Sequence, residues 1–221
     1  MVFSKISVHS IVSEPFEENA YIIHLANHTE CFVVDPGFEP EKVIGLLEKK
    51  GLKPLAVLVT HGHSDHIAGV GAIKRNWPDL WIGIGRDDSE KLSDPEKNLS
   101  LPFGLPIFGL PITAPEADVL FDDGDRREIA GIPLSVRHVP GHSAGHVVYL
   151  IETDTKPILF TGDVIFQRSI GRSDFPDSDS LLLIESIQKQ ILTLPDETVI
   201  YSGHGPKTTV GAERQHNPFL Q

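Results

Sequence analysis

The chain has 221 residues, of which 40% are hydrophobic and 23% are charged, as expected for a globular protein with a substantial core. Its formal net charge of −12 disfavours nucleic acid and anionic membranes as partners, because both are negatively charged. The single cysteine excludes an internal disulfide framework, neither a signal peptide nor a membrane-spanning stretch is visible, and we expect a cytoplasmic location.

Strands and helices are predicted to alternate in the N-terminal half. Turn signals and β-forming residues predict strands at 20–25, 31–34, 55–59 and 80–84, after a β-forming segment that contains Phe3 and Ile11. Apolar residues at helical spacing predict helices over 39–50 and 67–76. Cys31 lies in an apolar run, which predicts a buried hydrophobic side chain rather than a nucleophile.

Residues 86–118 interrupt this alternation, because the segment contains five prolines. We predict a helix over 87–92 and then a long surface loop. Loops of this length are usually lids or binding loops, and the alternative is a packed excursion without a role.

The second half repeats the strand pattern. Strands are predicted over 127–129, 134–138, 147–152, 158–160 and 198–201, and helices over 180–192 and 208–216. Acidic and hydroxyl side chains at 177–179 provide a cap for the first of these helices. Two strand-rich halves, each followed by helices, predict two packed sheets with helices outside.

A dense run of potential metal ligands follows the strand predicted at 55–59. It comprises His61, His63, Asp65 and His66. Alternate side chains of an extended segment share a face, so the first three can converge, while His66 can reach the same pocket from the next helix. Imidazole nitrogen and carboxylate oxygen suit zinc or iron, and a solvated polar turn is the weaker interpretation.

Three further donors occur in a similar setting, since His142, Asp163 and His204 each follow a predicted strand and have glycine nearby. Side chains on strand-end loops at one sheet edge are typical of an active site. Seven donors exceed the four that one tetrahedral zinc needs, and they suit two metals about 3.5–4 Å apart. His146 is predicted to support a ligand rather than bind metal, and no site role is predicted for His9, His24, His28, His138 and His216.

With these residues, the sequence resembles the metallo-β-lactamase superfamily over essentially its whole length. The run from His61 to His66 matches the HxHxDH motif, and the three later donors match in order and context. The resemblance implies an α/β fold, a four-layer αβ/βα sandwich of two mixed β-sheets with outer helices, as a single domain over residues 1–221. It also implies one metal held by His61, His63 and His142, a second held by Asp65, His66 and His204, and a bridging Asp163.

Within the superfamily the chain is most similar to the glyoxalase II (hydroxyacylglutathione hydrolase) group of short bacterial type, through the runs at 162–166, 169–176 and 203–206. This similarity implies that Arg172 holds a glutathione carboxylate, and a salt bridge to Asp174 is the alternative. Only seventeen residues follow His204, so we expect no C-terminal helical domain, and the 86–118 loop is a candidate replacement.

The resemblance predicts hydrolysis of a thioester such as S-lactoylglutathione by a metal-bound hydroxide. Asp65 and Asp163 would orient the two divalent metal ions, for which zinc is the first expectation and iron or manganese are alternatives. A persulfide dioxygenase with one iron on His61, His142 and Asp163 is the nearest rival. A β-lactamase, a nuclease and a purely structural metal site rank lower.

Overall fold

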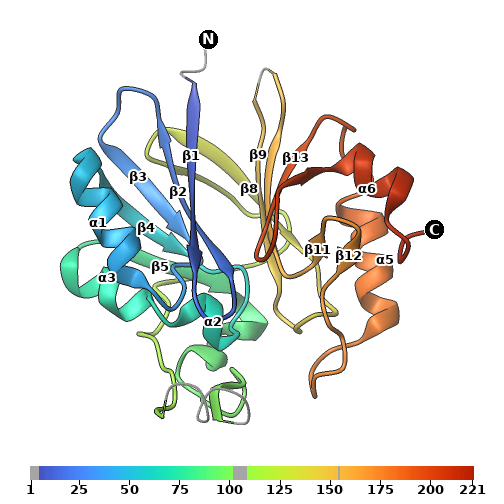
Figure 1. Ribbon diagram of the computed structural model, residues 1–221, viewed down its shortest axis with the longest axis horizontal. Coiled ribbons are helices and arrows are strands. Elements are labelled where there is room, and N and C mark those ends of the chain that lie inside the picture. The colour runs from blue at the N-terminus through green and yellow to red at the C-terminus, as the bar shows by residue number, and fades with distance from the viewer. Residues whose placement is uncertain (1–4, 102–108, 154) are drawn as a thin grey trace.

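The computed structural model describes residues 5–101, 109–153 and 155–221. Two mixed six-stranded sheets pack face to face, and helices cover their outer sides (Figure 1). The predicted fold class, an αβ/βα sandwich of two mixed sheets, is therefore confirmed. Phe3 and residues 102–108 of the predicted loop lie outside the described residues.

The first sheet comes from the N-terminal half. Its strands, in spatial order, are β1 (Ile6–Ser13), β2 (Glu18–Leu25), β3 (Glu30–Val34), β4 (Lys53–Leu58), β5 (Trp81–Gly85) and β6 (Val119–Phe121). β1 to β3 pair antiparallel, whereas β3 to β6 pair parallel. Helices α1 (Pro40–Lys50) and α3 (Val70–Asn76) bury their apolar faces against the outer side of this sheet (Figure 1).

The second sheet comes from the C-terminal half. Its spatial order is β14 (Thr208–Thr209), β13 (Val199–Ser202), β10 (Ile158–Gly162), β9 (Val147–Ile151), β8 (Ile132–His138) and β7 (Arg126–Ile129). Helices α5 (Ser180–Gln190) and α6 (Val210–His216) cover its outer side, and a small hairpin joins β11 (Ile165–Phe166) to β12 (Ser169–Ile170). The predicted cap of α5 is confirmed, since the Asp179 carboxylate accepts hydrogen bonds from the backbone of Leu181 and Leu182.

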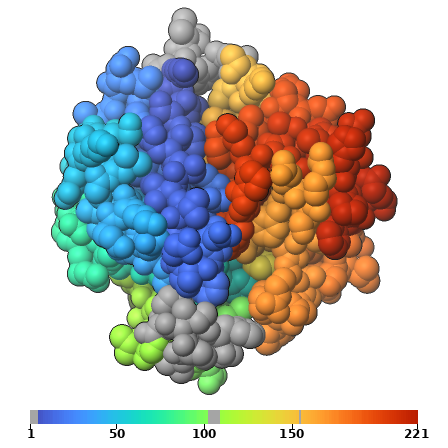
Figure 2. All heavy atoms as spheres, in the orientation of Figure 1, coloured from blue at the N-terminus to red at the C-terminus, as the bar shows by residue number. Residues whose placement is uncertain are grey.

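Apolar side chains fill all three interfaces of the sandwich. The layer between the sheets holds large buried residues such as Phe32, Tyr149 and Phe160, each of which stabilises the fold by about 1.5–3 kcal/mol through burial. Cys31 is buried in the layer under α1 and α3, and burial raises the pKa of its thiol to about 12, so the predicted hydrophobic role is confirmed. Figure 2 shows the two halves of the chain side by side.

Three sequence predictions need correction. The helix predicted over 67–76 begins earlier and is divided into α2 (Ser64–Ile67) and α3, because the chain at Gly69 runs against the carbonyls of Pro36 and Gly37. The strands β6, β11, β12 and β14 were not predicted, because they are too short to show a pattern. The predicted helix over 87–92 is the 3₁₀ helix η1 (Arg86–Leu92).

The 86–118 segment is not simply a surface loop. Asp88, Lys91, Asn98 and Ser100 are all buried, so this part of the chain packs into the body of the protein. Within the described ranges, no helix combines the length and apolar character needed to cross a bilayer.

Candidate metal centre

The seven predicted donors lie at one end of the sandwich, where the two sheets meet. β10 and β13 are parallel, so Asp163 and His204, which follow them, leave the sheet at the same edge. His142 lies in the connection between β8 and β9, and the histidine run follows β4. Hydrogen bonds join the two sheets at this edge, including the Val147 amide to the Thr60 carbonyl at 2.9 Å.

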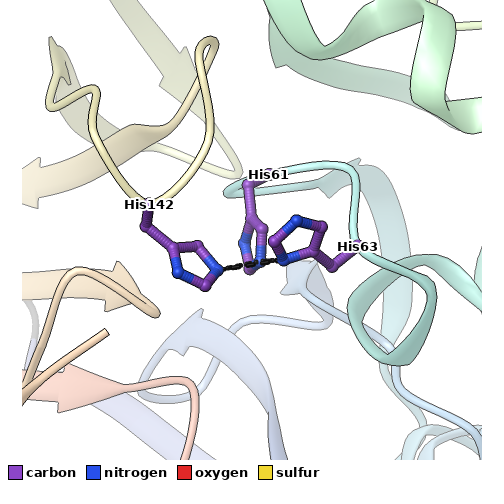
Figure 3. Close-up of side chains that lie close together, drawn as sticks. All are labelled: His61, His63 and His142. Carbon is purple, nitrogen blue, oxygen red and sulfur yellow. Dashed lines mark hydrogen bonds between the residues drawn. The ribbon is translucent and has the colours of Figure 1, made fainter. Parts of the chain in front are cut away.

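Three imidazoles form the first group of donors (Figure 3). His61 Nε2 lies 2.9 Å from His63 Nδ1 and 3.1 Å from His142 Nε2, and the last two nitrogens are 2.9 Å apart. All three side chains are buried. Three ring nitrogens directed at one point offer a ligand set that suits zinc or another divalent cation.

Asp65, His66 and His204 form the second group. His204 Nε2 lies 3.3 Å from Asp65 Oδ2, and His66 Nε2 lies 3.9 Å from the same oxygen. His63 precedes α2, and Asp65 and His66 occupy its first turn. Asp65 therefore reaches the cavity from a helix, not from the extended segment that the sequence suggested.

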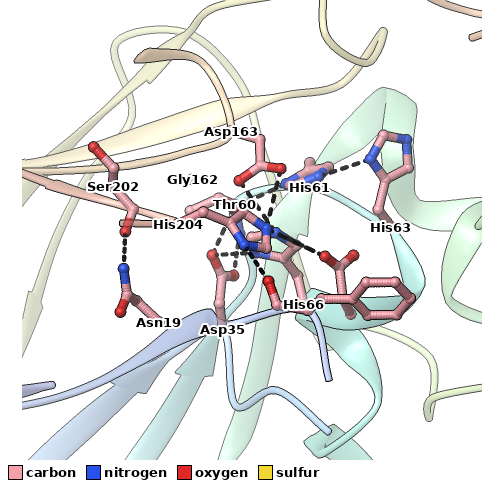
Figure 4. A network of polar contacts seen from close by, with 12 residues as sticks. Asn19, Asp35, Thr60, His61, His63, His66, Gly162, Asp163, Ser202 and His204 are labelled. Carbon is pink, nitrogen blue, oxygen red and sulfur yellow. Dashed lines mark hydrogen bonds and ion pairs between the residues drawn. The ribbon is translucent and has the colours of Figure 1, made fainter. Parts of the chain in front are cut away.

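Asp163 lies between the two groups, as Figure 4 shows. Its Oδ1 is 3.3 Å from His66 Nε2, while its Oδ2 is 3.5 Å from His204 Nε2 and 3.9 Å from His142 Nε2. One carboxylate thus faces donors of both groups.

The histidines are oriented by hydrogen bonds on the side away from the cavity. In four of them the outer ring nitrogen, Nδ1, lies against an oxygen, which leaves Nε2 directed at the cavity. The pairs are His61 with Thr60 Oγ1 at 3.1 Å, His66 with Asp35 Oδ2 at 3.0 Å, His142 with the Arg172 carbonyl at 2.7 Å and His204 with the Phe16 carbonyl at 2.9 Å.

The local electrostatics leave the histidines of the first donor group neutral and favour the protonated forms of His66 and His204 in the second. Burial, together with neighbouring histidines, lowers the pKa values of His61 and His63 well below the usual range, so both rings are neutral at pH 7. Burial opposes ionisation of Asp163, but His204 and His66 hold the pKa of its carboxyl well below the usual value. The carboxylate of Asp163 in turn outweighs burial and raises the pKa of His204 to about 10. A divalent cation in the second group would displace that imidazolium proton.

The donor set fits a metal by a further criterion. Among the described residues, the buried atoms His66 Nε2 and Asp163 Oδ1 lie 3.3 Å from each other and have no hydrogen-bond partner outside the donor cluster. Buried polar atoms are normally fully paired, so two buried donor atoms that face only their own ligand cluster suit a cation between them.

Two supporting carboxylates were missed by sequence reasoning. Asp35, for which no site role was predicted, accepts hydrogen bonds from Thr60 N at 2.8 Å and Thr60 Oγ1 at 2.7 Å, in addition to its contact with His66. Its place directly after β3 was an available signal, because the ligands also follow strands.

Asp88 is the second missed carboxylate, and it joins two ligand-bearing loops. It is fully buried and accepts hydrogen bonds from Gly62 N, Ser143 Oγ and Gly145 N, each at 2.8 Å. Lys91, also buried, pairs with it at 3.2 Å. Gly62 makes space for this lysine, since a β-carbon there would overlap Lys91.

His146 contacts the site without directing a nitrogen into it. Its ring stacks on His61 with 4.5 Å between centroids, and its Nε2 donates to the Thr161 carbonyl at 2.9 Å. Burial lowers its pKa to about 3, so the ring is neutral. These contacts agree with the supporting role predicted for it.

A cavity of about 350 Å³ opens beside the donors. Its apolar wall consists of Phe16, Leu99, Phe166, Ile170 and Phe175. Arg172 also lines the cavity, but its guanidinium makes a two-point contact with Asp174 at 2.9 and 3.0 Å. The salt bridge considered as the alternative role of Arg172 is therefore present.

The fold and this geometry define a metal-dependent hydrolase centre. Residues 14–204 match the Metallo-beta-lactamase superfamily, and the chain belongs to that superfamily. It is 36% identical to the hydroxyacylglutathione hydrolase GloC of Haemophilus influenzae over 93% of both chains.

Two solved structures extend the comparison. The chain is 39% identical to the BLEG-1 B3 metallo-beta-lactamase, with a TM-score of 0.89 over 97% of this chain and 100% of that one. It is 35% identical to TTHA1623 in a di-iron-bound form, with a TM-score of 0.81 over 96% of this chain and 100% of that one.

Proposed function

We propose that the protein is a binuclear metal-dependent thioesterase that cleaves a glutathione thioester such as S-lactoylglutathione to a hydroxy acid and glutathione. The observation that carries this proposal is the position of Asp163 between two groups of three donors. The similarity to GloC supports the substrate class. The single buried, unreactive cysteine is consistent with a cytoplasmic setting.

In this proposal His61, His63 and His142 would hold one metal, Asp65, His66 and His204 would hold the second, and Asp163 would serve both. Two divalent cations in such a centre would supply an activated water and polarise the reacting carbonyl. The protein's own groups fix the ligand rings through their outer nitrogens and exclude competing water with the apolar cavity wall. Zinc is the first expectation, and the di-iron form of TTHA1623 supports both the count of two and iron as an alternative.

Arg172 is proposed to hold a carboxylate of the glutathione moiety. Because its guanidinium is already paired with Asp174, a substrate carboxylate must compete with that contact. Asp174→Asn should therefore lower KM for glutathione thioesters by at most roughly fivefold, since an exposed ion pair is worth about 0.2–1 kcal/mol. Arg172→Ala should raise KM, and an unchanged KM in both variants would remove Arg172 from the binding site.

The direct test is hydrolysis of S-lactoylglutathione by zinc-loaded protein, followed by chelation and readdition of zinc. We expect turnover that is lost on chelation and restored with zinc, and we expect Asp163→Asn to abolish it. His28→Asn provides a matched control, because His28 is exposed and lies outside the donor groups. Intact thioester in the presence of two bound metals per chain would refute the proposal.

β-Lactam hydrolysis is a second candidate, which the 39% identity to BLEG-1 favours. A β-lactam amide presents the same kind of carbonyl to the same donors, so it belongs in the same assay. The proposed thioesterase requires a higher kcat/KM for the thioester, and the reverse order would identify a lactamase.

A persulfide dioxygenase is less well supported. It would use only His61, His142 and Asp163, and it would leave a second converging donor group without a role. One iron per chain together with oxygen uptake on glutathione persulfide would favour it over the thioesterase.

A further inference from the structure

We propose that Leu99 is a specificity-determining residue, and that the cavity prefers a thioester whose acyl group is apolar and larger than lactoyl. This inference rests on the proposed thioesterase function. It is drawn from the backbone conformation of Leu99, the anchoring of its neighbour Asn98 and the composition of the cavity wall.

The backbone of Leu99 has an unfavourable conformation. Its φ is +67°, in the left-handed region that glycine, asparagine and aspartate tolerate and a bulky leucine rarely adopts. Such strain persists only where surrounding contacts impose it, and it occurs preferentially at ligand-binding sites.

Asn98 supplies those contacts. Its fully buried side chain donates to the Lys91 carbonyl at 3.0 Å and to the Ile112 carbonyl at 2.9 Å. Its own carbonyl accepts from Ser64 N, at the start of the helix that carries Asp65, at 2.9 Å. The segment is thereby fixed to the donor-bearing helix, so Leu99 is held at a defined position relative to the proposed metal ligands.

Leu99 lines the cavity beside the donors, together with the apolar residues Phe16, Phe166, Ile170 and Phe175 of the described ranges. Among the described residues, and apart from the donor groups, the polar lining consists of Ser64 and of Arg172, which is paired with Asp174. A wall of this kind offers little to the hydroxyl of a lactoyl group but favours methylenes, at roughly fourfold in affinity for each one fully buried.

Three variants distinguish the effect of the Leu99 side chain from the effect of the backbone strain at this residue. Leu99→Gly removes both, whereas Leu99→Ala removes most of the side chain and retains a residue that disfavours positive φ. Ala130→Gly is the matched control, because Ala130 has φ +53° in the turn between β7 and β8, away from the cavity lining. It should relieve strain without altering substrate preference.

The first measurement is kcat/KM of the zinc-loaded protein for acetyl-, lactoyl- and hexanoylglutathione, with thermal unfolding of each variant. We expect the wild type to prefer hexanoyl, and both Leu99 variants to lose roughly tenfold of that preference. Ala130→Gly should keep it. The thermal midpoint should rise by about 2–4 °C in Leu99→Gly and Ala130→Gly but not in Leu99→Ala.

Calorimetric binding of hexanoate and acetate to the zinc-loaded protein separates this inference from the proposed function. If no thioester is cleaved, the proposed function fails, yet tighter binding of hexanoate that is lost in Leu99→Gly still supports the apolar recess. The assignment of Leu99 would be overturned if its variants lost kcat/KM equally for all acyl groups and affinity equally for both carboxylates. A wild-type preference for lactoyl- over hexanoylglutathione would also overturn it.

Discussion

Replacement of Asp88 by asparagine should weaken metal binding, although Asp88 belongs to neither donor group. One of its oxygens accepts hydrogen bonds from Gly62 N and Ser143 Oγ, and the other accepts from Gly145 N and pairs with Lys91. Burial opposes its ionisation, but Lys91 and these hydrogen bonds lower the pKa of its carboxyl, so Asp88 is charged at pH 7. It therefore fixes the loops that carry three of the proposed ligands.

The magnitude follows from the groups left without partners. The side-chain oxygen of asparagine can replace one carboxylate oxygen of Asp88, but its NH₂ group then faces the donors that the other oxygen accepted from. One backbone N–H therefore loses its partner, at a cost of about 1–3 kcal/mol. Lys91 keeps its ion pair with Asp177 at 2.6 Å, which reduces the usual penalty for breaking a buried pair. We expect a loss of roughly 2–4 kcal/mol in the free energy of unfolding.

Denaturant unfolding and competitive zinc titration measure the two effects of Asp88→Asn. Zinc affinity should fall about 10- to 100-fold, as is typical when a group that orients metal ligands is removed. Asp87→Asn is the matched control, because Asp87 is the next residue in the chain and its carboxylate is exposed. If Asp88→Asn keeps wild-type zinc affinity and unfolding free energy, the view that Asp88 fixes the ligand loops is wrong.

Other predictions concern the same edge of the sheets. Gly203→Ala should lower the free energy of unfolding by about 1–3 kcal/mol, since a β-carbon there would overlap Asp163. Gly45→Ala should raise it by about 0.5–1 kcal/mol, because Gly45 lies in helix α1 with open space around it. Denaturant unfolding checks both, and equal effects would contradict the packing argument. Asp35→Asn should lower the zinc affinity of the second donor group about 10- to 100-fold, because Asp35 orients His66. Calorimetric zinc titration measures the affinity of each group, and a loss confined to the first group would contradict this reasoning.

The sequence predicted the fold and named donor candidates that the structure brings together, but it did not indicate the residues that hold them in place. Strands and amphipathic helices follow from local periodicity, and closely spaced donors such as His61 and His63 form a pattern within a few residues. Asp88 and Asn98 have no such pattern, because their partners are distant in sequence: Asp88 contacts residues near 62 and 145, and Asn98 contacts residue 112. Their importance is visible only once burial and hydrogen bonds are known.

Backbone strain was equally invisible in the sequence. Leu99 stands between Asn98 and Ser100 in the segment predicted as a surface loop, and nothing local indicates that it has a positive φ beside the cavity. The reason for Gly62 was also inaccessible, since it depends on the side chain of Lys91 across the fold.

The central claim is that two cations share Asp163, and metal content per chain tests it most directly. Protein loaded with zinc, desalted and measured by plasma mass spectrometry should contain two zinc ions per chain, and the Asp163→Ala and His204→Ala variants should contain at most one. A wild-type content of one, unchanged by His204→Ala, would contradict the binuclear centre.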